Sequence, residues 1–295
     1  MAVYSIKDLE KLSGIKAHTL RIWEQRYGLI TPQRTDTNIR YYEDDDLKYV
    51  LNVALLNKSG IKISKIASMS PQEVEEQVSK ISNLDVREDA QIDALTLAMM
   101  EMDEYKFDRI ITFNTRRIGF ERTMLEVIYP FLDRLSVLWL TGSIDPVQEN
   151  FISFLIRQKV IAAIDREPLV QGGNANKFML YLPEGEKQEL SLLFMHYLLK
   201  ARKKQVIYIG QDISLTDLLD ACRIHKPAYI FTMISETFAR EPAQRYIDRL
   251  KDILPDCELL ITGYQVVAQN VSSKDNVHIL KSLDQTLDFL ASISS

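Results

Sequence analysis

Basic and hydroxyl side chains gather in the first 42 residues, in an order that suits contact with a nucleic acid. Seven Lys and Arg stand there against four Asp and Glu, whereas the whole 295-residue chain has a formal charge of −5. Guanidinium and ammonium groups bind phosphate, and Arg also bonds to base edges. The candidate contact residues are Lys16, His18, Thr19, Arg21, Arg26, Arg34, Arg40, Tyr41 and Tyr42. A basic segment in an acidic protein is expected when one module alone touches phosphate.

Two short helices around a glycine turn must position these side chains. Ser5 can cap the first helix, and Gly14 is free to adopt the positive φ of the turn. The basic end of the second helix is where a recognition helix meets base edges in a major groove. For Arg26 two roles stay open, a DNA contact or a structural pairing with Glu24 or with the hairpin that follows. Two aromatic residues of the second helix are expected in the core rather than on DNA: Trp23 and Tyr27.

The run TLRIWEQRYGLI from Thr19 to Ile30, followed by Pro32, Arg34, Arg40 and Tyr42, resembles the winged helix-turn-helix of the MerR family of transcription regulators. Within that family it is most similar to the light- and cobalamin-responsive branch, the CarH and LitR type. The resemblance implies binding to an inverted-repeat operator in double-stranded DNA, in the context of RNA polymerase, with a wing on the backbone or in the minor groove. Asn38 replaces the family's usual glycine in the wing, and Asn tolerates left-handed backbone.

Composition places the chain among ordinary soluble proteins of two or three domains, with 46% hydrophobic and 26% charged residues. Cys222 and Cys257 are far apart and form no paired motif, so they predict neither a disulfide framework nor a zinc site. No apolar run approaches the roughly 20 residues of a membrane span, and the start is no signal peptide. The family resemblance therefore implies the bacterial cytoplasm, with no membrane partner.

Hydrophobic periodicity divides the chain into three modules. Residues 1–75 are expected to form the winged helix-turn-helix domain, with a helix from 43 to 58, another near Ser64 and a third starting at Pro71. A polar linker is expected at 82–85, and a four-helix bundle at 86–168. From residue 176 to 295, five apolar strands alternate with helices, among them helices expected at 186–202 and 243–253, the pattern of a parallel sheet covered on both faces. The predicted fold class is thus multidomain, α and α/β, with a Rossmann-like (flavodoxin-like) sheet.

The last 120 residues or so resemble the cobalamin-binding Rossmann-like domain, and the bundle before them resembles its helical cap. In that family an Asp/Glu-x-His-x-x-Gly motif follows the first strand, and its histidine ligates cobalt. Here Glu186 keeps the acidic position, whereas Gln188 replaces the histidine and Ser191 the glycine. An amide is a poor cobalt ligand beside a neutral imidazole. Further positions that the resemblance assigns to the degenerate site are Ser235 and Gly263 in the sheet domain and Trp139, Glu149 and Asn150 in the cap.

Two further residues depart from the family pattern. Asn150 replaces a cap histidine, and Tyr264 replaces the second of two glycines, where its side chain is expected to fill the tunnel for the nucleotide tail. We therefore expect a regulator that keeps the fold without histidine-ligated cobalamin and has no metal site. Cobalamin bound through its own base or through water, a light- or cobalamin-responsive switch, and another small molecule or protein in the cleft between bundle and sheet remain as alternatives.

The chain shows no sign of catalysis. It contains no HExxH, nucleophile elbow, Walker loop or paired carboxylates, and no GxGxxG follows its first strand. His196 is expected to be a packed or surface residue of a helix, and His225 to end a helix, where a cation suits the dipole. An enzyme, such as a cobalamin-dependent methyltransferase component, is opposed by the basic head and the absent histidine. Self-association as a dimer or tetramer is expected through bundle and sheet, because the usual C-terminal coiled coil is missing.

Overall fold

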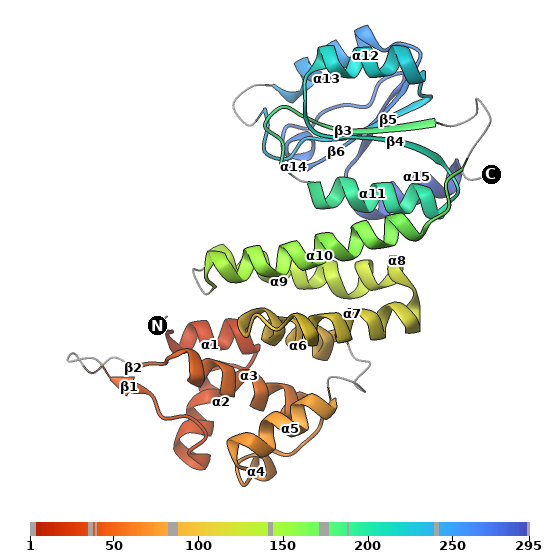
Figure 1. The fold of residues 1–295 in the computed structure, drawn as a ribbon. Coiled ribbons are helices and arrows are strands. Elements are labelled where there is room, and N and C mark those ends of the chain that lie inside the picture. Colours follow the sequence, from red (N-terminus) through yellow and green to blue (C-terminus); the bar gives the residue numbers. More distant parts are fainter. Residues whose placement is uncertain are drawn as a thin grey trace. The chain divides into compact units, whose positions relative to one another are not determined.

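The computed structural model describes residues 4–34, 38, 40–81, 88–140, 144–170, 177–187, 189–238 and 242–293. The chain divides into two compact units, Met1–Ile156 and Arg157–Ser295, which are taken here one at a time. The boundary falls within one long helix, α10 (Pro146–Arg166), whose two ends therefore belong to different units (Figure 1).

The N-terminal unit opens with α1 (Ile6–Ser13) and α2 (Ala17–Ile22), and α2 continues into a wider π-helical turn, η1 (Trp23–Tyr27). Ser5 caps α1 as predicted, since its hydroxyl accepts the Asp8 N–H while the Asp8 carboxylate accepts the Ser5 N–H at 2.8 Å. Gly14 takes the predicted left-handed conformation with φ 68°. The helix-turn-helix is thus set by a capping box and a single glycine.

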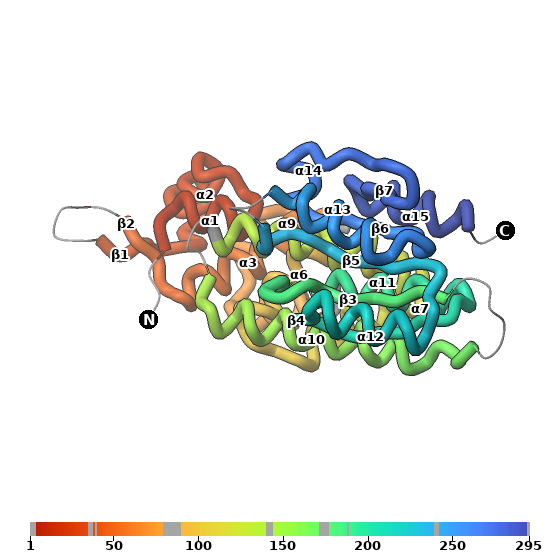
Figure 2. The backbone as a smooth tube through the Cα atoms, turned by 90° about the horizontal axis from the view of Figure 1, so that it is seen from above, coloured from red at the N-terminus to blue at the C-terminus, as the bar shows by residue number. Residues whose placement is uncertain are grey.

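A short hairpin follows, formed by the antiparallel strands β1 (Gln33–Arg34) and β2 (Arg40–Tyr41). The hairpin leads away from the helices of this unit (Figure 2). Asn38 has φ 66°, the left-handed conformation expected where the family has glycine. A bridge between Tyr4 and Tyr42 returns the chain to its start and holds the base of the hairpin against α1.

The remaining helices of this unit begin with α3 (Asp44–Lys58), α4 (Ile63–Ile66) and α5 (Pro71–Ile81), close to the predicted ranges. The predicted bundle contains α6 (Glu88–Met100), α7 (Glu104–Ile118), the run of α8 (Phe120–Thr123), η2 (Met124–Ile128) and α9 (Tyr129–Leu140), and finally α10. The predicted linker at 82–85 lies outside the described residues. The division into three modules stays a prediction.

The C-terminal unit is built around a five-stranded parallel sheet in the order β4-β3-β5-β6-β7. Its strands are β3 (Lys177–Pro183), β4 (Gln205–Ile213), β5 (Tyr229–Met233), β6 (Glu258–Thr262) and β7 (Val277–Leu280). Helices α11 (Glu189–Ala201) and α15 (Leu283–Ser292) lie on one face, and α12 (Leu215–His225) and α13 (Ala243–Ile253) on the other (Figure 1). Because helices cover both faces, β3 is buried along almost its whole length. The flavodoxin-like sheet is confirmed.

Two details of this unit differ from the prediction. The first helix begins at Glu189 rather than at Glu186, so Glu186 lies in the loop between β3 and α11. A short helix, α14 (Tyr264–Ala268), was not predicted because only five residues carry it. Within the described part of the chain, no helix combines the length and apolar composition that crossing a membrane requires.

Candidate DNA-binding face and carboxyl-edge cluster

The second helix of the helix-turn-helix presents a polar face to solvent. Leu20 and Trp23 are 1% and 3% exposed, so they fix one side of α2 and η1 against the core. On the other side Lys16, His18 and Arg21 are exposed. Thr19 and Tyr27 are half-buried and Arg26 is exposed. The amphipathic pattern of this helix thus exposes its basic residues to a phosphate backbone or base edges, although Lys16 also lies 3.4 Å from the Glu10 carboxylate.

The hairpin divides its predicted contact residues differently. Arg34 is exposed, and its Nη1 donates a hydrogen bond to the side-chain Oδ1 of Asn38 at 2.7 Å. This bond crosses the hairpin. Tyr41 is half-buried. Tyr42 is only 1% exposed, and burial raises the pKa of its hydroxyl. The prediction that Tyr42 contacts DNA is therefore wrong in this structure, because its side chain belongs to the core.

Glu24 pairs with the hairpin and not with Arg26, whose contact with DNA stays a prediction. The Glu24 carboxylate binds Arg40 of the hairpin, with 3.3 Å between Oε1 and Nε. Arg26 instead places its guanidinium over the Tyr27 ring, 5.6 Å from the ring centre. Arg40 therefore joins the hairpin to the second helix. This pair links the two elements that would meet DNA.

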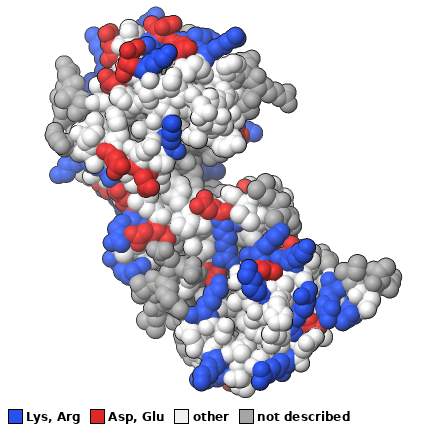
Figure 3. All heavy atoms as spheres, turned by 180° about the vertical axis from the view of Figure 1, so that it is seen from behind, with Lys and Arg blue, Asp and Glu red and all other residues white. Residues whose placement is uncertain are grey.

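Lys and Arg side chains gather over the N-terminal unit and beside its hairpin on the face that Figure 3 shows. From the burial of individual residues, the basic side chains on the second helix and hairpin that face solvent are Lys16, Arg21, Arg26 and Arg34. Charge and shape together make this surface the candidate nucleic-acid interface.

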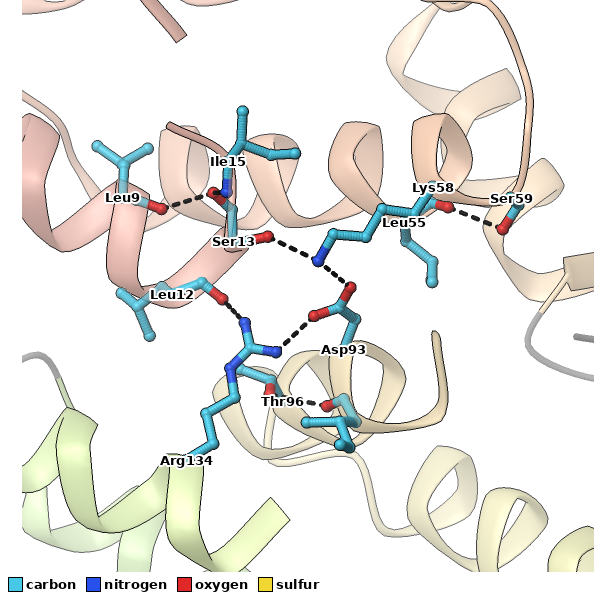
Figure 4. A network of polar contacts seen from close by, with 11 residues as sticks. Leu9, Leu12, Ser13, Ile15, Leu55, Lys58, Ser59, Asp93, Thr96 and Arg134 are labelled. Carbon is cyan, nitrogen blue, oxygen red and sulfur yellow. Dashed lines mark hydrogen bonds and ion pairs between the residues drawn. The ribbon is translucent and has the colours of Figure 1, made fainter. Parts of the chain in front are cut away.

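Beneath the helix-turn-helix lies a buried ionic cluster (Figure 4). Asp93 of α6 is 4% exposed and binds Lys58 of α3 through Oδ2 and Arg134 of α9 through Oδ1, each at 2.5 Å. Lys58 Nζ also donates to the carbonyl oxygen of Ser13 at 3.0 Å, and Arg134 Nη2 donates to that of Leu12. The cluster thus satisfies two carbonyls at the end of α1 and ties the turn to the bundle.

Sequence reasoning did not find this cluster. Its members are far apart in the chain, and each belongs to a different helix or turn. One signal was present: Asp93 interrupts an apolar stretch of α6, where Ala90, Ala94 and Leu95 are all buried. A carboxylate at such a position must find cationic or hydrogen-bonding partners.

In the C-terminal unit the predicted ligand residues of the sheet domain meet at the carboxyl edge of the sheet. The strand order reverses between β3 and β5, the place where open α/β sheets generally bind ligands. Glu186 follows β3 and is 2% exposed. Its Oε2 accepts the backbone N–H groups of Ser235 at 2.7 Å and Glu236 at 2.9 Å, with a longer bond from Thr237 at 3.5 Å. The carboxylate therefore fills the backbone cradle after β5.

Gly263, after β6, holds this cradle in place from below. Its φ is 118°, and a Cβ atom there would lie 2.3 Å from the carbonyl oxygen of Ile234. Only glycine fits so close an approach. The next residue, Tyr264, donates its N–H to Ser235 Oγ at 3.3 Å and leaves 69% of its side chain exposed. The expectation that Tyr264 fills an internal tunnel is therefore wrong here.

The other predicted ligand residues do not join this cluster. Ser191 lies in the first turn of α11, and Gln188 falls outside the described residues. The cap positions belong to the N-terminal unit, where Trp139 of α9 is 44% exposed. Glu149 is half-buried and Asn150 exposed, on α10. In the described parts of the chain, no three His, Cys, Asp or Glu side chains are grouped to hold a metal ion.

His196 was expected to be either a packed or a surface residue of a helix, and it is a packed residue of α11. Its ring stacks on Tyr208 of β4, with 5.2 Å between ring centres. Burial, with a smaller contribution from Lys200, lowers the pKa of His196 to about 4, so its ring is neutral at pH 7. Cys222 and Cys257 are likewise buried and unpaired with each other, as predicted.

Comparison with known proteins supports the interpretation of the N-terminal residues as a DNA-binding domain. Residues 4–73 match the family described as MerR HTH family regulatory protein. The chain is 25% identical to the HTH-type transcriptional repressor CarH of Myxococcus xanthus over 85% of each chain. It is 26% identical to the repressor CarA of the same organism, over 94% of this chain and 90% of that one. Among solved structures, a cobalamin-binding protein from Desulfitobacterium hafniense is 14% identical, with a TM-score of 0.35, over 68% of this chain and 98% of that one.

The matched residues 4–73 contain the capped first helix, the glycine turn, the basic second helix and the hairpin. The two repressors extend the similarity over most of the chain. The chain thus carries a MerR-type helix-turn-helix domain at its N-terminus and is similar over most of its length to two transcriptional repressors.

Proposed function

We propose that this protein binds a specific double-stranded operator through α2, η1 and the hairpin, and that it regulates transcription without histidine-ligated cobalamin. The main support for DNA binding is that the second helix has one buried apolar side and one exposed basic side. Leu20 and Trp23 lock one side into the core, while Lys16, His18 and Arg21 stand in solvent on the other. In this arrangement Arg21 is the candidate for a base contact, and Arg34 for a phosphate contact.

One recognition helix covers only half an operator, so we infer that the protein acts as a dimer or tetramer on an inverted repeat. The helical bundle and the sheet domain would supply the contacts between copies. The similarity to named repressors favours a regulator over an enzyme.

Three features oppose histidine-ligated cobalamin in the C-terminal unit. The position of the family's cobalt ligand is Gln188 in this sequence. Glu186, whose counterpart in the family orients that ligand, is bonded through Oε2 to the backbone after β5 and through Oε1 to the Lys187 N–H at 3.1 Å. His196 is stacked on Tyr208 with a lowered pKa, so it is committed to packing. The residues present therefore do not fit a cobalt ligand set of that kind.

The DNA-binding proposal is tested with a duplex selected from a random-sequence library by the full-length protein. Arg21→Ala should weaken binding to this duplex by about 1–3 kcal/mol, roughly 5- to 150-fold in Kd, if Arg21 contacts a base. Fluorescence anisotropy measures the change. Arg223→Ala is the control, because Arg223 is exposed in the other unit and pairs with Asp220.

Arg34→Ala separates phosphate contact from base contact. It should weaken binding to selected and random duplexes alike and lower the slope of log K against log salt by about one. If neither variant changes binding, or if the wild-type protein retains no duplex at low salt, the proposed interface is wrong.

The cobalamin proposal is tested by incubating the full-length protein with adenosylcobalamin in the dark and passing it through a desalting column. We expect a colourless protein and an unchanged oligomer size in gel filtration. A retained cobalt absorption band would contradict the proposal and would favour cobalamin held through its own base or through water.

A further inference from the structure

The turn between the two helices of the helix-turn-helix is held by cations from other helices. The C=O groups in the last turn of a helix have no intrahelical donor, and two of them in α1 accept from side chains. Lys58 of α3 donates from Nζ to the carbonyl oxygen of Ser13 at 3.0 Å, and Arg134 of α9 donates from Nη2 to that of Leu12. Lys58 belongs to the matched residues 4–73, whereas Arg134 lies 122 residues after Leu12, in the bundle. The turn is thus held in part by a residue outside the DNA-binding domain.

The connection from this turn to the second helix is short. Three residues, Gly14 to Lys16, separate the end of α1 from the start of α2. On the far side of the turn, the Ala17 N–H donates to the Glu10 carboxylate at 3.2 Å, which ties the start of α2 back to α1. A connection of three residues that is bonded at both ends has little freedom. The placement of Ser13 therefore determines the placement of the first turn of α2.

Arg134 is itself fixed on the bundle side. Its Nη1 binds Asp93 of α6 at 2.5 Å, and Asp93 also binds Lys58 at 2.5 Å. Figure 4 shows Lys58 and Arg134 reaching toward the turn from two helices, with Asp93 between them. Asp93 is 4% exposed, so water and salt screen these bonds little. A planar guanidinium that is bonded on two sides keeps one orientation. The position of α9 thus sets the position of the Leu12 carbonyl.

We propose that Arg134 is a positioning residue for DNA binding, which sets the placement of α2 in the major groove through the Leu12 carbonyl and touches no DNA itself. This inference rests on the proposed DNA contacts of α2. It goes beyond a structural role, because it predicts a change in DNA affinity in a protein whose fold is intact. Operator affinity would then depend on where the bundle holds α9.

Arg134→Met tests the proposal, because methionine keeps most of the apolar stem and loses the guanidinium. Fluorescence anisotropy with the full-length protein and the selected duplex should give a Kd about 2- to 30-fold higher than for the wild type, the range for residues that touch neither binding partner. A random duplex should show a smaller change, because its binding depends on phosphate contacts rather than on base contacts. Arg122→Met is the matched control. Arg122 is exposed in the same unit, where it pairs with Glu126 at 2.6 Å, and its loss should leave both Kd values unchanged.

Two further variants separate the placement of α2 from stability. In the Arg21→Ala background, Arg134→Met should weaken binding less than in the wild type, because the base contact that depends on the placement is already lost. The triple variant Lys58→Met, Asp93→Leu and Arg134→Leu leaves no charge in the cluster. Its Kd should still rise, because the two carbonyls of α1 then have no cationic donor. Circular dichroism establishes that each variant is folded at the temperature of the binding measurement.

An unchanged Kd for folded Arg134→Met would overturn the proposal, and so would an effect of equal size with and without Arg21. Where Arg134→Met does not fold, an unchanged Kd for the triple variant has the same meaning. If Arg21→Ala weakens binding and Arg134→Met does not, the proposed interface stands and the positioning role alone is wrong. If neither Arg21→Ala nor Arg34→Ala changes binding, the interface itself is wrong, and the positioning role fails with it.

Discussion

The two units hold their buried carboxylates in opposite ways. Asp93 in the N-terminal unit is 4% exposed and is bonded by the side chains of Lys58 and Arg134. Glu186 in the C-terminal unit is 2% exposed and is bonded by backbone N–H groups after β5. Both groups are satisfied, yet one relies on two long cationic side chains and the other on the main chain.

The first arrangement joins several helices to one another, whereas the second belongs to one loop at the carboxyl edge of the sheet. Side chains reach across elements, so the Asp93 cluster links α1, α3, α6 and α9, and it does so at the turn of the helix-turn-helix. The N–H groups that bind Glu186 belong to the loop after β5, so their positions depend on that strand and loop alone. Removing the charge of Asp93 leaves two half-buried cations without a counter-charge, whereas removing the charge of Glu186 leaves only weakened hydrogen bonds.

Asp93→Asn is expected to have the largest effect. It keeps the shape of the side chain but leaves Lys58 and Arg134 facing a neutral amide. Breaking a buried ion pair typically costs about 3–5 kcal/mol, and we expect the low end, about 3, because the two cations keep some exposure. Urea unfolding followed by tryptophan fluorescence measures it, since Trp23 and Trp139 both belong to the N-terminal unit.

Glu126→Gln is the matched control for that measurement, because it lies in the same unit as the two tryptophans. Glu126 pairs with Arg122 at 2.6 Å, but the two side chains are 32% and 62% exposed, so the loss of stability should be small. If the free energy of unfolding of Asp93→Asn is no lower than that of this surface variant, the cluster does not stabilise the N-terminal unit. Replacing Asp93, Lys58 and Arg134 together by Leu, Met and Leu should recover much of the lost stability, because no buried charge then remains.

Gly263→Ala should displace the backbone N–H groups that bind Glu186 while leaving the Glu186 side chain unchanged. The new Cβ would lie 2.3 Å from the Ile234 carbonyl oxygen, so the loop that carries the N–H donors must move. Overpacking and a strained φ together should destabilise the sheet by about 2–3 kcal/mol. Faster hydrogen exchange in peptides from β5 and β6 would report it. Gly60→Ala is the control: φ there is 96° but no atom lies within 4 Å, so only the strain remains.

Glu186→Gln should have a smaller effect, about 1.5–2 kcal/mol. An amide oxygen can still accept from the N–H groups of Ser235 and Glu236, but the charge that strengthens those bonds is lost. Hydrogen exchange in the β5 loop measures the change. Glu258→Gln serves for comparison, because Glu258 is about half exposed in its bond to His278. Equal effects of the two substitutions would mean that the buried cradle is no stronger than a surface contact.

The sequence was sufficient for features that local pattern decides. Alternation of apolar strands and helices predicted the parallel sheet, and α13 begins and ends at the predicted residues. Ser5, Gly14 and Asn38 were predicted from their side chains alone, since capping and positive φ depend on the residue itself. The basic residues of the second helix were also found, because a helix of known phase shows which of its side chains face outward.

What the sequence could not supply are contacts between distant residues. Tyr41 ends a two-residue strand and Tyr42 follows it, and this alternation is too short to show which of the two side chains turns inward. Arg26 was the cation considered as a partner for Glu24, and only the path of the hairpin brings Arg40 to it instead. Glu186 was recognised as important from its position after β3, but its partners are backbone N–H groups, which carry no signal in the sequence.

His196 extends the comparison to a third buried titratable group, which the C-terminal unit keeps neutral rather than paired. Burial lowers its pKa to about 4 from an unfolded value near 6.5. The unfolded chain therefore binds a proton between these values that the folded chain does not, and stability that is complete above pH 6.5 is lost as the pH falls toward 4. Partial exposure limits the effect to about 1 kcal/mol. The free energy of unfolding of the wild type minus that of His196→Phe, from urea titrations followed by circular dichroism, should fall by about 1 kcal/mol from pH 7 to pH 4.5. A constant difference across this range would mean that the ring titrates in the folded protein as it does in the unfolded chain.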